Sequence, residues 1–261
     1  MKKTDRENFS YIPDLDDEER ILLRSILDKA RRTNDIFKPL FSFFLDERKL
    51  RLSKTVLASE HFDNYRAYGG SDASKRCVLA LLPEYYDESE LCFPITAVTF
   101  SYRAVDKLSH RDILGTLMGL NIRRECIGDI YVGEGRSCVF VYNTVLDDTL
   151  LVSKIGRVGV KTEIGFDETL VKEEKFKLIE GTVSSLRVDS IVSTATGLSR
   201  DKSASLVRSG LVTCDYKTAA SVSDRLETGV VFSVRGYGKF ELLSQSPTKK
   251  DRIHITVKKY L

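Results

Sequence analysis

The chain has 261 residues, of which 42% are hydrophobic and 30% are charged, a balance typical of a folded protein that argues against extensive disorder. Residues 1–20 contain no apolar run, so we expect no signal peptide, and no stretch approaches the about 20 apolar residues that span a bilayer. Five scattered cysteines without a C-x-x-C pair and only three histidines argue against a metal site and favour reduced thiols in the cytoplasm.

The net charge of +3 is distributed unevenly along the chain. Residues 181–261 contain 13 Lys and Arg against 7 Asp and Glu, a net charge of +6, so the remainder carries −3. A basic end on a slightly acidic body suits a polyanionic partner. Many soluble domains carry a similar charge without binding nucleic acid, so charge alone does not decide between the two.

The first segment, residues 1–85, is predicted to be helical. Residues 14–32 begin with acidic side chains and end with basic ones, the polarity that the helix dipole favours. Apolar residues at helical spacing predict that one face of this helix is buried. These residues are Ile21, Leu22, Ile26, Leu27 and Ala30.

The rest of this segment is also interpreted as helix. Residues 36–52 are apolar and are interrupted by Pro39, which predicts a break before a further helix. The glycine pair at 69–70 ends an aromatic stretch, and Ser71 or Ser74 is a candidate cap for a following helix.

The middle segment, residues 86–166, alternates between strand and helix patterns. A β-rich stretch at 92–102 precedes a helix that Ser109 caps, with Asp112 completing a capping box and Gly119 in the left-handed position at its end. A hairpin with a Gly-Glu-Gly turn, a short amphipathic helix and a final strand follow. The order βαββαβ predicts a ferredoxin-like domain.

RNA-recognition modules share this topology, but their strand signature of a basic residue, glycine and spaced aromatics is missing from "GRSCVFVYN". Stacking of bases on this sheet is therefore not expected. Four basic residues lie near the ends of the middle helix. Two interpretations remain open for them, namely side chains solvated by water or a second RNA or ribosome contact. They are His110, Arg111, Arg123 and Arg124.

The third segment, residues 175–261, follows a charge-mixed joint at 167–178. A helix over 186–196 ends at Gly197, Ser199 caps a second helix, and Gly210 ends that helix before a series of strands. We expect the tail, residues 248–260, to form an edge strand. The exposed side of the helix pair carries basic residues beside a positive helix N-terminus, an arrangement that suits phosphate. These residues are Arg187, Arg200, Lys202 and Arg208.

This segment resembles the S4-like RNA-binding domain. The resemblance lies in Arg187 and Asp189, the Ser199-Arg200 pair, the exit at 210–212 and Lys217 after the turn. The sequence departs from the family pattern at three positions that affect the turns but remove no basic contact. They are Ser203, Asp215 and Val230.

The resemblance extends upstream. The motifs "HFDNYRAYGG", "LSHRDILGTLMGLNIRRECIGDI" and "VSSLRVDSIVS", with "GLSR", "SGLV" and "SVRGYGKF", together resemble the YlmH family of bacterial S4-domain proteins. The resemblance implies a helical N-terminal part, a ferredoxin-like middle domain and an S4-like domain. It also implies association with the ribosome, contacts with large-subunit rRNA and tRNA, and a role in quality control of stalled nascent chains.

The sequence therefore predicts an α+β, non-catalytic, monomeric RNA-binding protein without cofactor or metal. An alternative is an RNA-modifying enzyme, since Arg187-Val188-Asp189 is similar to the Arg-Leu-Asp setting of pseudouridine synthases, although it lies inside the S4-like helix. A second alternative is a cell-division adaptor. The residues expected to bind RNA are Arg187, Ser199, Arg200, Lys202, Arg208, Lys217 and Arg235.

Overall fold

The computed structural model describes residues 9, 11–12, 14–171, 175–248 and 252–261 of the chain. It consists of two compact units, Met1–Lys172 and Glu173–Leu261. The border between them falls inside the joint predicted at residues 167–178. Both units combine helices with antiparallel sheets, so the predicted α+β class is confirmed. Within the described residues, no helix combines the length and apolar character needed to span a bilayer.

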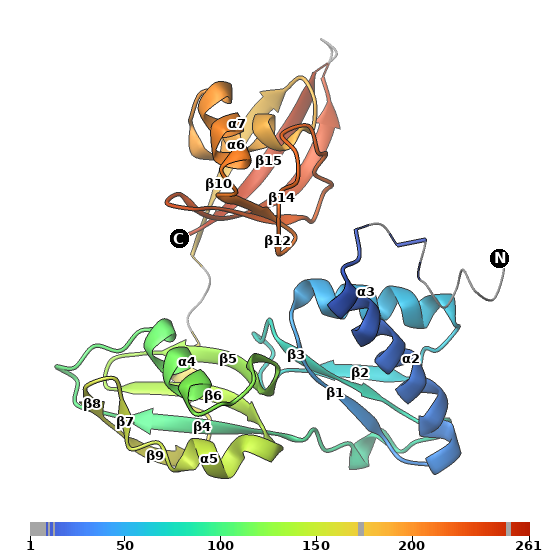
Figure 1. Cartoon of the computed structure of the whole chain (residues 1–261), viewed down its shortest axis with the longest axis vertical. Coiled ribbons are helices and arrows are strands. Elements are labelled where there is room, and N and C mark those ends of the chain that lie inside the picture. The colour runs from blue at the N-terminus through green and yellow to red at the C-terminus, as the bar shows by residue number, and fades with distance from the viewer. Residues whose placement is uncertain (1–8, 10, 13, 172–174, 249–251) are drawn as a thin grey trace. The chain divides into compact units, whose positions relative to one another are not determined.

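The first half of unit 1 contains a sheet as well as helices. Helices α2 (Asp17–Ile36) and α3 (Glu47–Ser59) accompany three antiparallel strands in the order β1-β3-β2 (Figure 1). The strands are β1 (Leu40–Leu45), β2 (Tyr65–Tyr68) and β3 (Cys77–Leu81). The prediction of a purely helical N-terminal segment is therefore wrong.

The sequence predicts a helix where the structure has β3, because this strand lies in the centre of its sheet. Its residues Val78 to Leu81 are completely buried, two of them toward α2 and α3 and two on the other face. A strand buried on both faces shows no alternation of apolar and polar residues. Ser71 and Ser74 form a hydrogen-bonded turn, in which the Ser74 amide donates to the Ser71 carbonyl, and they cap no helix.

Helix α2 begins as its acidic first turn predicts. Asp16 is the N-cap and forms a capping box with Glu19, which is itself buried against Arg48. The predicted buried face is largely confirmed, because Ile26, Leu27 and Ala30 are buried, but Ile21 is 65% exposed and Leu23 is fully buried instead.

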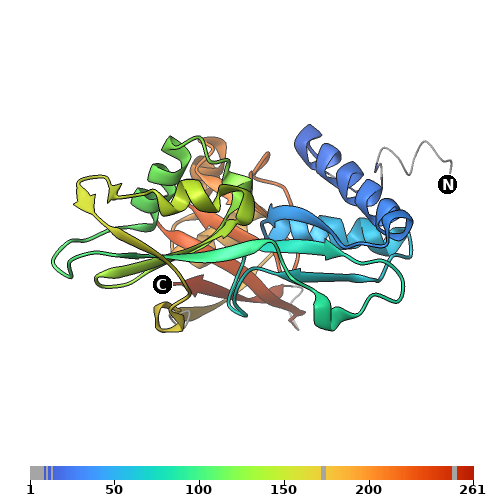
Figure 2. The same cartoon turned by 90° about the horizontal axis from the view of Figure 1, so that it is seen from below.

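The second half of unit 1 has the predicted βαββαβ order. Its four strands form an antiparallel sheet in the order β5-β6-β4-β9, the ferredoxin-like arrangement, and Figure 2 shows both helices on one side of it. The elements are β4 (Ile95–Ser101), α4 (His110–Gly119), β5 (Ile127–Val132), β6 (Arg136–Tyr142), α5 (Leu146–Leu150) and β9 (Lys161–Ile164), with the small hairpin β7 (Lys154–Ile155) and β8 (Val158–Gly159) between the last two.

The ends of α4 confirm one local prediction and correct another. Ser109 is the N-cap and forms the capping box with Asp112. Gly119 remains helical, and the left-handed residue after the helix is Asn121, with φ of 61°. Asparagine tolerates this conformation better than most residues, so the helix does not need glycine there.

The face of the middle sheet that points away from α4 and α5 is covered. Phe140 on this face is 3% exposed and packs with Phe44 of β1 in a cluster shared by the two halves of unit 1. A Cβ atom at Gly70 would lie 2.2 Å from the Phe140 ring, and one at Gly128 would lie 2.7 Å from the Phe44 ring. The two halves are therefore in contact, and this sheet face is closed to bases.

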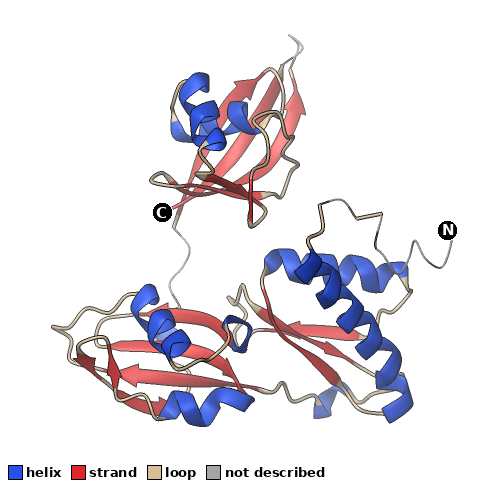
Figure 3. Cartoon of the chain, viewed as in Figure 1, coloured by secondary structure: helices blue, strands red, loops and turns tan. Residues whose placement is uncertain are grey.

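Unit 2 is a six-stranded sheet with two helices on one face (Figure 3). The sheet order is β10-β15-β14-β13-β11-β12, and the core lies between the sheet and the helices. The elements are β10 (Phe176–Val183), α6 (Val188–Thr196), α7 (Arg200–Arg208), β11 (Val212–Cys214), β12 (Lys217–Thr218), β13 (Val231–Val234), β14 (Gly238–Pro247) and β15 (Ile253–Tyr260).

The helix pair α6–α7 has the predicted ends. Gly197 and Gly210 follow the two helices with φ of 74° and 67°, the left-handed region where glycine has no steric penalty. The expectation of an edge strand in the tail is wrong, because β15 pairs with β10 on one side and β14 on the other.

Candidate nucleic-acid interface

Asp189 organises the start of the basic helix pair. The Arg187 guanidinium donates to Asp189 Oδ1 at 3.1 Å and to Oδ2 at 3.3 Å, and Arg200 Nε donates to Oδ2 at 3.0 Å. The Asp189 side chain is 6% exposed, whereas those of Arg187 and Arg200 are 33% and 51% exposed. The buried Asp189 carboxylate thus holds both arginines, while part of each guanidinium side chain remains exposed to solvent.

The same contacts determine the charge state of Asp189. Burial acts to raise the pKa of this carboxyl group, but the hydrogen bonds and charges of Arg187 and Arg200 outweigh burial and hold the pKa below its ordinary value. Asp189 is therefore ionised at neutral pH. Two guanidinium groups share one carboxylate, so this cluster contributes a net charge of about one to the surface, less than the sequence suggests.

Three other predicted residues remain uncompensated. Lys202 lies in the first turn of α7, Arg208 in its last turn and Arg235 in the turn after β13. All three are exposed, and none forms an ion pair with an acid in the part of the chain that the structure describes. Such cations can bind phosphate without breaking an internal contact.

The end of α7 gathers predicted residues from distant positions in the sequence. The Arg235 amide donates to the Leu211 carbonyl at 2.9 Å, just after the helix. A Cβ atom at Gly210 would lie 3.7 Å from the Thr218 side chain, beside Lys217. Arg208, Lys217 and Arg235 therefore all border this end of α7, and Lys217 itself is partly buried in the β11–β12 hairpin.

Ser199 acts as a helix cap. Its hydroxyl oxygen accepts the Lys202 amide at 3.4 Å, as expected for the N-cap of α7. Arg200 and Lys202, in this first turn, are both exposed at the positive end of the helix. Asp201 is also exposed here, and its charge favours the helix N-terminus.

The structure separates the four basic residues of the middle segment. Arg124 is partly buried, and its guanidinium donates to the Ile127 carbonyl at 2.5 Å. Burial and the neighbouring Arg76 lower its pKa to about 10. Burial and the charge of Arg124 likewise lower the pKa of His110. Arg124 is therefore partly buried and hydrogen-bonded within its own turn, and its interpretation as a second RNA or ribosome contact stays a prediction.

Arg123 and Arg111 stay at the surface. The Arg123 guanidinium lies 5.0 Å from the centre of the Phe43 ring and pairs with Glu125 at 3.0 Å. Arg111 is exposed in the first turn of α4, next to the exposed His110. Of the four residues, His110 and Arg111 thus remain the pair best placed to meet a partner.

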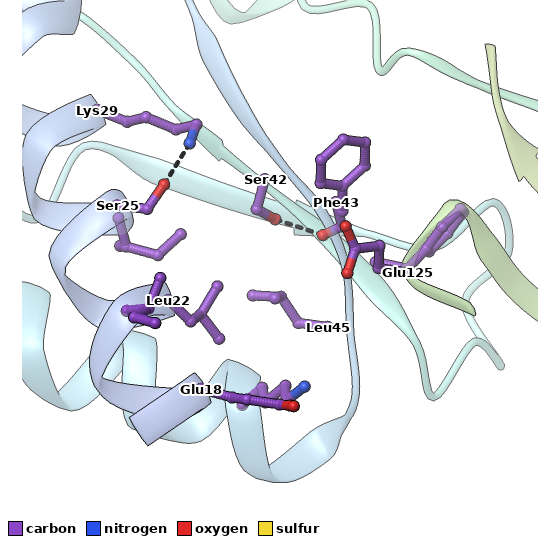
Figure 4. Close-up of a pocket in the computed structure, with 12 residues that line it drawn as sticks. Glu18, Leu22, Ser25, Lys29, Ser42, Phe43, Leu45 and Glu125 are labelled. Carbon is purple, nitrogen blue, oxygen red and sulfur yellow. Dashed lines mark hydrogen bonds between the residues drawn. The ribbon is translucent and has the colours of Figure 1, made fainter. Parts of the chain in front are cut away.

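A cavity of about 410 Å³ lies between α2 and β1 (Figure 4). Its lining is largely apolar, with Lys29 turned toward Ser25, whose hydroxyl accepts a hydrogen bond from the ammonium group at 2.6 Å. Burial lowers the pKa of Lys29. None of the residues that the sequence predicts to bind RNA lines this cavity.

Sequence reasoning missed a row of aromatic and lysine side chains on the outer face of the C-terminal sheet. Here lysine ammonium groups lie over aromatic rings of the same strand, of a neighbouring strand or of the β11–β12 turn. The signal that could have found it is the alternation of aromatic and basic residues at both ends of this segment, "KFKL" and "KKY". We call it the aromatic–lysine row, and its members are Phe176, Lys258, Tyr260, Lys239 and Tyr216.

The fold and the surface together define an α+β protein with a ferredoxin-like part and a basic C-terminal unit. Comparison with known families gives a match of residues 89–167 to the model described as "Putative RNA-binding domain in YlmH". The chain is 30% identical over 246 residues to "Ribosome-associated protein quality control protein P2" of Bacillus subtilis (strain 168), a match that covers 92% of this chain and 94% of the relative. The chain therefore belongs to the YlmH family.

A solved structure is also similar. "Cell division protein ylmH from Streptococcus pneumoniae" is 25% identical, with a TM-score of 0.48, and the match covers 60% of this chain and 96% of that chain.

Proposed function

We propose that this chain is a non-catalytic RNA-binding protein that associates with the ribosome. The observation that carries the proposal is the surface around α7, where Lys202, Arg208 and Arg235 are exposed and uncompensated within the described residues. Arg187 and Arg200 extend this surface from their anchor on Asp189. Cations held in fixed positions contact phosphates and set the register on RNA without selecting a base sequence.

Family membership supports the ribosomal part of the proposal. The Bacillus subtilis relative, matched over almost its full length, is named for ribosome association and protein quality control. The family model matched by residues 89–167 is described as an RNA-binding domain. We infer that the RNA bound is large-subunit rRNA together with tRNA, and that binding serves the rescue of stalled nascent chains in the cytoplasm.

The surroundings of Asp189 support a non-catalytic role over an enzyme of the pseudouridine-synthase type. A catalytic carboxylate has to reach a substrate. The Asp189 carboxylate is instead 6% exposed and occupied by two guanidinium groups. Its role in this unit is to orient arginines.

The test measures how affinity for bulk tRNA and purified large ribosomal subunits depends on salt. Replacing Lys202 and Arg208 by alanine removes two phosphate contacts, so affinity falls about tenfold at low salt. The slope of log K against log[salt] decreases in magnitude by about two, since each cation contributes roughly one.

A matched control replaces Lys38 and Lys54 by alanine, because both are exposed lysines of unit 1 outside the predicted surface. This control changes the net charge by the same amount and leaves affinity within twofold. Equal losses in the two double variants, or no loss in either, contradict the proposal.

A further inference from the structure

The register of the C-terminal sheet places the aromatic–lysine row on a single face. Phe176 of β10 lies directly opposite Tyr260 of β15. Lys258 precedes Tyr260 by two residues and lies opposite Glu241, which itself follows Lys239 by two residues. Residues two apart on a strand and residues opposite one another share a face of the sheet.

This face is the one that the helices leave uncovered. The intervening residues Phe240 and Val257 are fully buried in the core with α6 and α7, so the row points to the other side. Phe176 is 51% exposed although it is aromatic. A single exposed ring is common on protein surfaces, so a binding surface here depends on the neighbouring rings and lysines of the row.

Cations and rings alternate along the row. The Lys258 ammonium lies 5.0 Å from the centre of the Phe176 ring and 4.6 Å from that of Tyr260. The Lys239 ammonium lies 5.2 Å from the Tyr260 ring centre, on the next strand. Glu241 accepts a hydrogen bond from the Tyr260 hydroxyl at 2.7 Å and thereby fixes this ring in position. The same carboxylate pairs with the Lys258 ammonium at 4.0 Å, and the Lys258 side chain is 19% exposed, so Lys258 helps to hold the rings.

Tyr216 continues the row beyond the strands. It occupies the tight turn between β11 and β12 with Asp215, and both have left-handed backbone angles, φ of 66° and 49°. Asparagine and glycine are the usual residues in such a turn. Here the turn presents a tyrosine ring that is 46% exposed and lies 5.8 Å from the Lys239 ammonium.

We propose that the aromatic–lysine row binds unpaired nucleotides of RNA. Bases stack on the exposed rings of Phe176 and Tyr216, and the positive charge of Lys239 between them attracts the phosphates, while Lys258 and Glu241 support the Tyr260 ring. The inference rests on the RNA-binding function proposed above and adds to it a second contact for a single-stranded segment. The excess positive charge of residues 181–261 favours a polyanion with planar groups over a basic partner.

The experiment compares two RNA probes of equal length with the full chain. One is a 5′-labelled, mixed-sequence 12-nucleotide RNA without self-complementarity, and the other is a 12-base-pair RNA duplex. Replacing Phe176 by alanine and Tyr216 by asparagine, which tolerates the left-handed turn, removes both exposed rings. We expect about a tenfold loss of affinity for the single strand, no more than a twofold change for the duplex, and an unchanged salt slope.

Two controls separate stacking from structure. Phe176→Tyr with Tyr216→Phe keeps both rings and restores wild-type affinity for the single strand. Tyr85 is a matched residue, since it is fully exposed with a φ of 61° and lies in unit 1, so Tyr85→Asn leaves binding unchanged. The chain contains no tryptophan, so quenching of tyrosine fluorescence by the single strand reports stacking directly, and it decreases in the ring-deleted variant.

The outcomes distinguish this inference from the function on which it rests. The inference is overturned if the ring-deleted variant binds the single strand with wild-type affinity, or if its affinity for both probes falls equally. It is also overturned if polyglutamate of equal charge displaces the RNA. In each of these cases the loss caused by Lys202→Ala with Arg208→Ala still supports the proposed function. A wild-type chain that binds neither probe overturns the inference, and one that also fails to bind bulk tRNA and large ribosomal subunits overturns the proposed function.

Discussion

Asp189 shows how one buried acid can shape a basic surface. It neutralises about half the charge of Arg187 and Arg200 but fixes Arg187 at the start of α6 and Arg200 at the start of α7. Long side chains that are already ordered lose less conformational entropy when they bind a ligand. The contacts with Asp189 therefore lower the net positive charge of this surface and hold the two arginine side chains in defined positions.

Replacing Asp189 by asparagine is expected to lower the free energy of unfolding of unit 2 by about 2 kcal/mol at neutral pH, because hydrogen bonds to a charged partner are lost. The folded-state pKa of Asp189 is depressed, so its stabilisation is fully present above the unfolded pKa near 4 and disappears as the pH falls through the lower folded value. Urea unfolding between pH 6 and pH 3 measures the difference, which shrinks toward acid. A difference that stays constant over this range contradicts the assignment.

The residues that sequence could predict follow local rules. Gly197 and Ser199 were found because helix ends demand particular residue types within a few positions. The ion pairs of Asp189 were missed because one partner lies eleven residues away, and the contact exists only after two helices have packed together. The environment of Arg124 could not be predicted for the same reason, since Arg76, whose guanidinium donates to the Arg124 carbonyl at 3.4 Å, comes from another part of the chain.

At the level of elements, the sequence predicted amphipathic segments correctly and fully buried ones poorly. Helix α4 and the β5–β6 hairpin follow their periodicity or turn signals. Strands β1 and β3 are short apolar runs, which periodicity alone cannot distinguish from buried helix. Strand β15 was assigned to an edge for its lysines, but Lys258 lies on the open face of a central strand and Lys259 at its end, over the Phe240 ring.

Helix α7 gives a prediction that separates capping from binding. Ser199→Ala removes the N-cap and is expected to lower the stability of unit 2 by about 1 kcal/mol, while RNA affinity changes less than twofold. Ser199→Thr retains a capping hydroxyl and serves as the control. Thermal unfolding and filter binding measure the two effects. A tenfold loss of affinity without loss of stability shows instead that the hydroxyl contacts RNA.

For the whole molecule, the distribution of hydrophobic clusters defines which pieces are independent. The core of unit 2 lies entirely within residues 183–257. The two halves of unit 1 have separate sheets but share the cluster that contains Phe44, Val78 and Phe140. The boundary expected near residue 85 therefore divides two sheets and not two separate cores.

This arrangement predicts the behaviour of fragments. Residues 175–261 are expected to unfold cooperatively with the same midpoint as in the full chain, since their core is self-contained. A fragment of residues 86–166 exposes Phe140 and its neighbours and is expected to aggregate or to unfold at lower denaturant concentration than residues 14–171. Circular dichroism measures the unfolding midpoints of the fragments, and light scattering measures their aggregation. Equal stability of the short and long fragments contradicts the shared cluster.

The close approach of Phe140 to Gly70 and of Phe44 to Gly128 has a consequence for how such chains can diverge. Each glycine lacks a side chain in the place that an aromatic ring from another stretch of sequence fills. A larger residue at either glycine is tolerated only when the facing ring becomes smaller, so these four positions are expected to change in pairs among homologues. Their pattern of substitution would record a contact that no periodicity in a single sequence reveals.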